Sequence, residues 1–404
     1  MLDGEYGEAV GIAMRVLTRL GDVYGAKRMI EVSSGHSVSF IYNCGYDALV
    51  ESNEKLVSMG AKVKVPTTMN VGSATSENPK DFRIPKNWVD KHKRLEAAGI
   101  RMGAIPSWSC IPYFYENVPK FGENVVWAES NCVSYVNSVI GARTNRYTGF
   151  VDLFGAIAGR VPGYGLHIGE NRFAKIAFEL KIKPKDFRES DYPLLGYLVG
   201  EKTGERIPLI IGLPKSSSRT QLASLGAAAA SSGSVALYHV LEVTPEAKTL
   251  KQATGGDRLE EKCSVFRTDL EKIREKLNTA GDGNVDFVSL GCPHYNVEQI
   301  AKVARLIEGK KVHDSVEMWI STSRLVKQLL ERIGLTSILR SSGVKILTDS
   351  CPANGPSFVC GFKTMMTDSA KMAHYGPMQV KAETIYGSTE QCVEAAVKGE
   401  FKSN

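Results

Sequence analysis

The amino-terminal half of the chain combines one clear helical pattern with short apolar runs. Between residues 4 and 20 apolar positions recur every three or four residues, and Gly21 follows as a stop, which predicts an amphipathic helix. Three apolar runs, at 29–32, 61–65 and 125–128, have the length of strands, and small polar residues follow each of them. The pattern therefore predicts strands that end in polar loops.

The carboxyl-terminal half alternates more regularly. Apolar runs at 285–290, 316–320 and 344–347 are separated by helical patterns at 296–308 and 323–334. This order is typical of a parallel sheet with crossover helices, so we predict the α/β fold class. Polar and sulfur-containing residues follow the three runs, at 291–294, 321–324 and 348–352. Because ligands of open α/β sheets bind outside the carboxyl ends of the strands, we expect these three tips to converge on one cleft.

Length and composition fit a compact protein of several domains. The chain has 404 residues, of which 43% are hydrophobic and 23% charged, and this composition differs from that of disordered or fibrous chains. A charged, turn-like stretch at 200–206 suggests a boundary between two α/β regions. We predict one region over 1–205, which contains Cys110 and the polar loops, and another over 206–404, which contains Cys292 and Cys351.

Charge and hydropathy restrict the expected partners. Fifty Lys and Arg against forty-four Asp and Glu give a formal net charge of +6, which is too small and too evenly spread for a nucleic-acid surface but suits a small anionic substrate. The amino terminus is acidic and does not resemble a secretory signal, so we expect a cytoplasmic protein. The most apolar stretch, 222–241, is interrupted by serines and predicts a small-residue helix followed by a strand, so we expect no transmembrane segment.

Three of the eight cysteines lie in the loops that follow predicted strands or turns. Cys292 and Cys351 each precede a proline, and Cys110 lies two residues before one; a proline next to a thiol fixes the turn that presents the sulfur. Taken singly, each of these cysteines is more often a small buried hydrophobic residue. Without a CxxC motif, a zinc ribbon or a ferredoxin is disfavoured. Three thiolates from distant loops can instead hold a 4Fe-4S cluster that keeps one iron free as a Lewis acid. We expect the remaining cysteines to be structural: Cys44, Cys132, Cys263, Cys360 and Cys392.

Two polar segments are candidates for substrate binding, and each has an ordinary alternative. The segment with Glu129, Ser130, Asn131, Arg143 and Arg146 can bind an oxygen-rich anion, because guanidinium groups pair with carboxylate or phosphate in a bidentate manner. It is equally typical of a polar helix with a capped start.

The other segment is Gly35, His36 and Ser37, which can place backbone donors and an imidazole at a strand tip. A single histidine in a turn is more often an ordinary hydrogen-bonding residue, and the same holds for His294. The segment 363–375, with Lys371 and His374, either closes over the site or is a solvated face. No segment has the spacing of a nucleotide-binding loop.

With these residues assembled, the chain resembles the large, catalytic subunit of the aconitase X family over nearly its whole length. The residues that carry the resemblance lie at 3–9, 33–36, 65–72, 108–112, 129–131, 141–146, 159–162, 290–294, 348–352 and 365–375. The resemblance implies an aconitase-like architecture, with several parallel-sheet α/β subdomains around a central cleft. It also implies a 4Fe-4S cluster whose ligands are Cys110, Cys292 and Cys351.

The resemblance further implies a hydro-lyase. The expected substrate is (R)-5-phosphomevalonate, dehydrated to trans-anhydromevalonate 5-phosphate, an isoprenoid precursor. Other members of the family dehydrate cis-3-hydroxy-L-proline, and a noncatalytic metal-binding module is the alternative from another class. The swivelling domain that closes the cleft is expected on a separate small subunit that supplies a serine as the base, so the predicted assembly is a heterodimer and we name no base in this chain. The expected substrate-binding residues are Gly35, His36, Ser37, Asn70, Val71, Glu129, Ser130, Asn131, Arg143 and Arg146.

Overall fold

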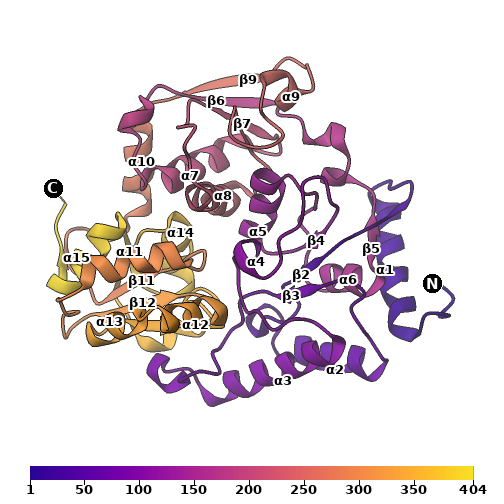
Figure 1. Ribbon diagram of the computed structural model, residues 1–404, viewed down its shortest axis with the longest axis horizontal. Coiled ribbons are helices and arrows are strands. Elements are labelled where there is room, and N and C mark those ends of the chain that lie inside the picture. Colours follow the sequence, from indigo (N-terminus) through magenta and orange to yellow (C-terminus); the bar gives the residue numbers. More distant parts are fainter. Residues whose placement is uncertain (404) are drawn as a thin grey trace.

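Residues 1–403 are described by a computed structural model in which three groups of elements each surround a parallel sheet (Figure 1). The first group has a three-stranded sheet in the order β3-β2-β4 and a two-stranded antiparallel pair, β1 and β5. Its strands are β1 (Met29–Glu31), β2 (Gly35–Ser37), β3 (Thr67–Met69), β4 (Val126–Trp127) and β5 (Arg160–Pro162). Its helices are α1 (Glu8–Val23), α2 (Tyr46–Ser58), α3 (Lys86–Met102), α4 (Pro112–Tyr115), α5 (Ser130–Tyr135) and α6 (Val151–Ala158).

The second group, drawn at the top of Figure 1, has a four-stranded parallel sheet in the order β8-β7-β6-β9. Its strands are β6 (Ile176–Leu180), β7 (Pro208–Ile211), β8 (His239–Val240) and β9 (Glu261–Val265), and its helices are α7 (Asp191–Thr203), α8 (Arg219–Gly233), α9 (Leu250–Thr254) and α10 (Arg267–Leu277). Helices α7 and α8 pack backbone to backbone, because a Cβ atom on Gly196 would lie 2.1 Å from the carbonyl oxygen of Leu225. The predicted boundary at 205–206 falls inside this sheet, between the paired strands β6 and β7, so it does not separate two sheets.

The third group contains a five-stranded parallel sheet in the order β13-β12-β11-β14-β15. Its strands are β11 (Phe287–Leu290), β12 (Glu317–Ser321), β13 (Lys345–Leu347), β14 (Thr364–Thr367) and β15 (Glu383–Tyr386), with a short antiparallel pair, β10 (Gly283–Asn284) and β16 (Glu400–Phe401). Its helices are α11 (Val297–Ile307), α12 (Arg324–Arg332), α13 (Leu335–Ser341), α14 (Ala370–Gln379) and α15 (Thr389–Lys398). Helix α11 buries Ile300, Val303, Ala304 and Ile307 at helical spacing against this sheet.

The predicted α/β class is confirmed, and the strands and helices predicted in the carboxyl-terminal half are found within a few residues of their expected ends. The helix predicted over 4–20 is found as α1, but Gly21 lies inside it and does not end it. Two further predictions in the amino-terminal half are wrong. Residues 61–65 are not a strand, since β3 begins only after Pro66, which has no N–H to donate. Residues 35–37 are not a loop tip but the central strand β2, whose backbone pairs with β3 and β4.

Strands β2 and β3 were missed because they are short and buried on both faces, so polar residues such as Thr67 and His36 are fully covered although the sequence pattern is that of a loop. The small-residue helix and strand predicted over 222–241 are found as α8 and β8. Among residues 1–403, no helix has both the length and the apolar character needed to cross a bilayer.

Candidate active site

The expected convergence of the cysteine-bearing loops is confirmed by a cavity of about 260 Å³ at the carboxyl ends of the first and third sheets. Cys110 precedes α4, Cys292 follows β11, and Cys351 follows β13. Val71, which follows β3, and residues from α5 and α14 complete the wall. The cavity is lined by Val71, Cys110, Glu129, Ser130, Asn131, Gly291, Cys292, Pro293, Cys351, Ala353, Asn354, Lys371, Tyr375 and Gln379. The tip after β12, residues 321–324, does not line this cavity, so the predicted convergence of three carboxyl-terminal tips holds for two of them.

His294 joins the three cysteine loops. Its backbone N–H donates to the Sγ atom of Cys110 at 3.2 Å, and its Nε2 lies 3.2 Å from the carbonyl oxygen of Ser350. Burial lowers the pKa of His294 to about 4, so the ring is neutral near pH 7 and its Nε2–H donates to that carbonyl. A side chain that sequence reasoning left as an ordinary turn residue thus ties the loop of Cys292 to the loops of Cys110 and Cys351.

Two of the three cysteines are buried, and Cys292 is partly exposed. Cys110 and Cys351 are each 8% exposed. Burial raises the pKa values of Cys110 and Cys292, and burial together with the neighbouring Cys292 raises the pKa of Cys351 to about 12. The thiolate forms are therefore stable only beside compensating positive charge, and bound metal is one way to supply it.

The spacing of these thiols suits a polynuclear group better than a single ion. Within residues 1–403 no three His, Cys, Asp or Glu side chains lie close enough to hold one metal ion. In an iron–sulfur cluster each thiolate binds a different iron atom, so the ligands surround the group without meeting at one point. Three cysteines around one cavity, with no fourth cysteine in its wall, fit a cluster that keeps one iron free of protein ligands.

A buried ion pair between Lys371 and Glu129 forms the polar side of the cavity. The Nζ of Lys371 lies 2.6 Å from Oε1 of Glu129, 3.2 Å from Oγ of Ser130 and 3.0 Å from Oδ1 of Asn131. Burial alone would raise the pKa of Glu129, but the charge of Lys371 and its hydrogen bond lower it; Glu129 in turn raises the pKa of Lys371 in spite of burial. Both groups are therefore ionised at neutral pH.

Lys371 is the main residue that the sequence did not assign. It lies in the segment 363–375, which the sequence analysis left either as part of the site or as a solvated face. The structure places Lys371 in the wall of the cavity. Lysine on one face of a helix gives no signal of burial. Only the contact with Glu129, 242 positions earlier in the chain, reveals its place.

His36 and Asn70 support Glu129 from behind the cavity wall. Nδ2 of Asn70 donates to Oε2 of Glu129 at 3.0 Å, and Oδ1 of Asn70 lies 3.2 Å from Nε2 of His36. The other ring nitrogen of His36 lies 2.9 Å from Oγ1 of Thr68. Neither His36 nor Asn70 lines the cavity, so both orient the carboxylate.

The predicted substrate-binding residues fall into two sets. Val71, Glu129, Ser130 and Asn131 line the cysteine cavity, whereas Gly35 and Ser37 lie in the buried strand β2. Arg143 lines a different cavity, together with Arg172 and His239, where its Nη1 donates to the carbonyl oxygen of His167 at 3.3 Å. Arg146 is exposed. The structure therefore does not bring the two arginines into the cysteine cavity, and their substrate role stays a prediction.

The buried histidines predict a loss of stability in mild acid. Burial lowers the pKa values of His36 and His294 from 6.5 to about 4, so as the pH falls below 6.5 the unfolded chain binds protons before the folded chain does. Each histidine should lower the free energy of unfolding by about 2 kcal/mol between pH 7 and pH 5, and the loss should level off near pH 4. Urea unfolding at the two pH values measures it. An NMR titration that found either ring protonated near pH 6.5 in the folded protein would contradict the expectation.

Comparison with known proteins agrees with this fold. Residues 1–170, 174–275 and 285–398 match the family models described as the first, second and third domains of aconitase X, one for each sheet group. The structure superimposes on the crystal structure of Thermococcus kodakaraensis aconitase X in its holo-form with a TM-score of 0.88, at 34% identity over 98% of this chain and 97% of that one.

Curated relatives of similar identity carry two enzyme names. A cis-3-hydroxy-L-proline dehydratase of Hypocrea jecorina is 37% identical over 99% of this chain and 68% of its own length. A phosphomevalonate dehydratase large subunit of Methanocaldococcus jannaschii is 36% identical over 98% of this chain and 97% of its own length. Fold, site and relatives together define a dehydratase-type α/β protein. The chain belongs to the aconitase X family.

Proposed function

We propose that this chain is the large subunit of an iron–sulfur hydro-lyase that dehydrates (R)-5-phosphomevalonate to trans-anhydromevalonate 5-phosphate. The observation that carries the proposal is the cavity that three cysteines line together with the ion pair of Lys371 and Glu129. Its relatives in the same family are named dehydratases, which supports the class of reaction.

Cys110, Cys292 and Cys351 are the residues that would hold a 4Fe-4S cluster in this cavity. When bound, such a cluster supplies a Lewis acid for the hydroxyl group that leaves the substrate. His294 keeps the loops of these cysteines together through its two hydrogen bonds. The buried wall around the thiols limits access of water to the sulfur atoms.

Lys371 is suited to bind the carboxylate of the substrate. Its ammonium group lines the cavity beside Glu129, so an anion there would contact the positive end of this ion pair. Ser130 and Asn131 hold Lys371 in place and add polar groups to the same side of the cavity. Negative charge that develops on the substrate carboxylate while the α proton is removed would be stabilised there.

Glu129 is a poor candidate for the base that removes this proton. Its Oε1 already accepts from Lys371 and its Oε2 from Asn70, and Lys371 lowers its pKa against the effect of burial. We therefore assign the base to a small partner subunit, in which a serine is expected. Relatives named as large subunits support a partner of this kind.

Charge favours phosphomevalonate over hydroxyproline. Phosphomevalonate carries a carboxylate and a phosphate, whereas hydroxyproline is a zwitterion without net charge. A chain with a net charge of +6 favours the anionic compound by long-range attraction. cis-3-Hydroxy-L-proline remains the second candidate, because its dehydratases are as similar in sequence.

Assays with both compounds test the proposal. The chain is co-expressed with its small subunit under anaerobic conditions, and product is followed by mass spectrometry. We expect loss of water from phosphomevalonate by the complex and none by the large chain alone. Turnover of hydroxyproline but not of phosphomevalonate would overturn the substrate assignment, and full activity without the partner would overturn the assignment of the base.

A further inference from the structure

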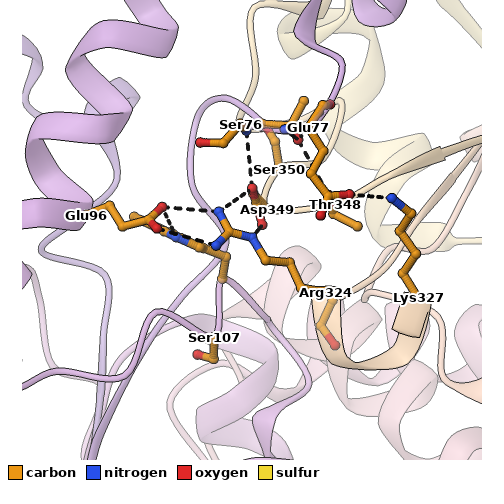
Figure 2. A network of polar contacts seen from close by, with 12 residues as sticks. Ser76, Glu77, Glu96, Ser107, Arg324, Lys327, Thr348, Asp349 and Ser350 are labelled. Atoms are coloured by element: carbon orange, nitrogen blue, oxygen red, sulfur yellow. Dashed lines mark hydrogen bonds and ion pairs between the residues drawn. The ribbon is translucent and has the colours of Figure 1, made fainter. Parts of the chain in front are cut away.

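Arg324, the first residue of α12, joins two carboxylates from distant parts of the chain (Figure 2). Its Nε and Nη2 atoms lie 2.6 and 2.7 Å from the two carboxylate oxygens of Asp349, and Nη2 also lies 3.1 Å from Oε2 of Glu96. The side chain of Asp349 is fully buried, and those of Arg324 and Glu96 are 28% and 20% exposed. One guanidinium group thus links helix α3 of the first sheet group to the loop after β13 of the third.

The contact with Asp349 reaches the loop of Cys351. Asp349 lies two residues before Cys351 and has a φ angle of 66°, a left-handed conformation that few residues other than glycine adopt. Its carboxylate also accepts from the backbone N–H of Ser76 at 3.3 Å, and its carbonyl oxygen accepts from that of Gly72 at 2.7 Å. The bidentate pair with Arg324 therefore holds a strained backbone next to the cysteine.

The contact with Glu96 reaches the loop of Cys110 in a parallel way. The indole Nε1–H of Trp108 donates to Oε2 of Glu96 at 2.9 Å. Trp108 is fully buried, has a φ angle of 44° and lies two residues before Cys110. Arg324 therefore reaches two residues of left-handed conformation, each two positions before a cysteine of the cavity. It binds Asp349 directly and Trp108 through Glu96.

We propose that Arg324 is a positioning residue that fixes the loops of Cys110 and Cys351 relative to each other. The reason for fixing the loops rests on the proposed function, because a cluster bound by these thiols requires a fixed distance between them. Its geometry requires arginine: the planar fork binds Asp349 with two nitrogens and Glu96 from the same group, whereas the single ammonium of a lysine cannot span both. Arg324 does not line the cavity and acts through the two loops.

Thiol reactivity in the reduced, metal-free full chain tests the inference without any cluster. Cys110 and Cys351 are buried, so they react with iodoacetamide only when their loops open. Breaking the partly exposed network in Arg324→Met should speed alkylation of both by about tenfold, measured by mass spectrometry with Cys263 as the internal reference. Arg324→Lys keeps the charge but not the fork, so it should speed both reactions as well.

Two variants sharpen the test. Arg83→Met removes another arginine contact between the first and third groups, that of Nη1 with Oε1 of Glu317 at 2.6 Å, and should leave both rates unchanged. Trp108→Phe keeps the aromatic ring but removes the N–H that reaches Glu96, so it should speed alkylation of Cys110 and not of Cys351. The second variant remains informative if Arg324→Met fails to fold.

The outcomes separate this inference from the proposed function. If Cys110 and Cys351 were alkylated no faster in Arg324→Met than in Arg83→Met, the positioning role would be overturned. Wild-type alkylation rates in Arg324→Lys would overturn it as well. Iron and sulfide analysis after anaerobic reconstitution is run on the same proteins, and Arg324→Met should hold less of both than the wild type. A wild-type chain that binds neither, while the alkylation contrast persists, would overturn the cluster and leave the positioning role supported.

Discussion

Replacing Cys292 or Cys351 with alanine is expected to abolish retention of iron and sulfide and, with it, all dehydration by the complex. Each thiol is one of three that line the cavity, and a cluster left with two protein ligands is held too weakly to survive purification. Absorption spectra of the anaerobically reconstituted protein, together with iron and sulfide analysis, measure the loss. Phosphomevalonate turnover on the same samples measures the activity.

Cys263→Ala is the matched control. Cys263 lies on β9 of the second sheet, where its thiol contacts Oε1 of Glu261 at 3.2 Å, away from the cavity. We expect this variant to retain the cluster and the activity of the wild type. If the three variants behaved alike, the ligand assignment would be wrong, and a colourless wild-type protein that bound zinc would favour the noncatalytic metal-binding module.

The sequence predicted the third sheet and its cysteines well because both depend on local signals. Strands β11, β12 and β13 are apolar runs separated by amphipathic helices, and the fold rule that ligands bind at strand carboxyl ends then brings Cys292 and Cys351 together. Cys110 could be added because a proline lies two residues after it. The family resemblance then implied that these three cysteines are the ligands of one iron–sulfur cluster.

The parts that the sequence did not predict depend on contacts between distant segments. Nothing near Arg324 in the chain indicates that it binds Glu96, 228 positions earlier. The strand β2 was missed because a sheet buried on both faces hides polar residues such as His36 as effectively as apolar ones. Arginine in a polar loop predicts anion binding, yet Arg143 faces another cavity, since periodicity does not say which side of a domain a loop faces.

The ion pair at the cavity gives a second large expected effect. Lys371→Met removes the cation that compensates Glu129 and leaves a buried carboxylate with Asn70 as its remaining strong partner. Loss of one partner from a buried pair should lower the free energy of unfolding by about 3–5 kcal/mol at neutral pH. Urea unfolding of the variant and the wild type measures the difference. Arg206→Met, which breaks the more exposed pair with Glu261, is the control and should cost about 1 kcal/mol or less.

The pH dependence of this loss distinguishes an uncompensated charge from a packing defect. Without Lys371, burial raises the pKa of Glu129 above its value in the unfolded chain, so the carboxyl group is neutral and tolerated at low pH, and stability falls as the pH rises through the new pKa. The difference from the wild type should therefore be smaller at pH 5 than at pH 8. The double variant Glu129→Gln/Lys371→Met, which buries no charge, should regain most of the lost stability. A difference that is constant with pH, or a double variant no more stable than Lys371→Met, would show that lost packing around Lys371 and not the charge of Glu129 causes the effect.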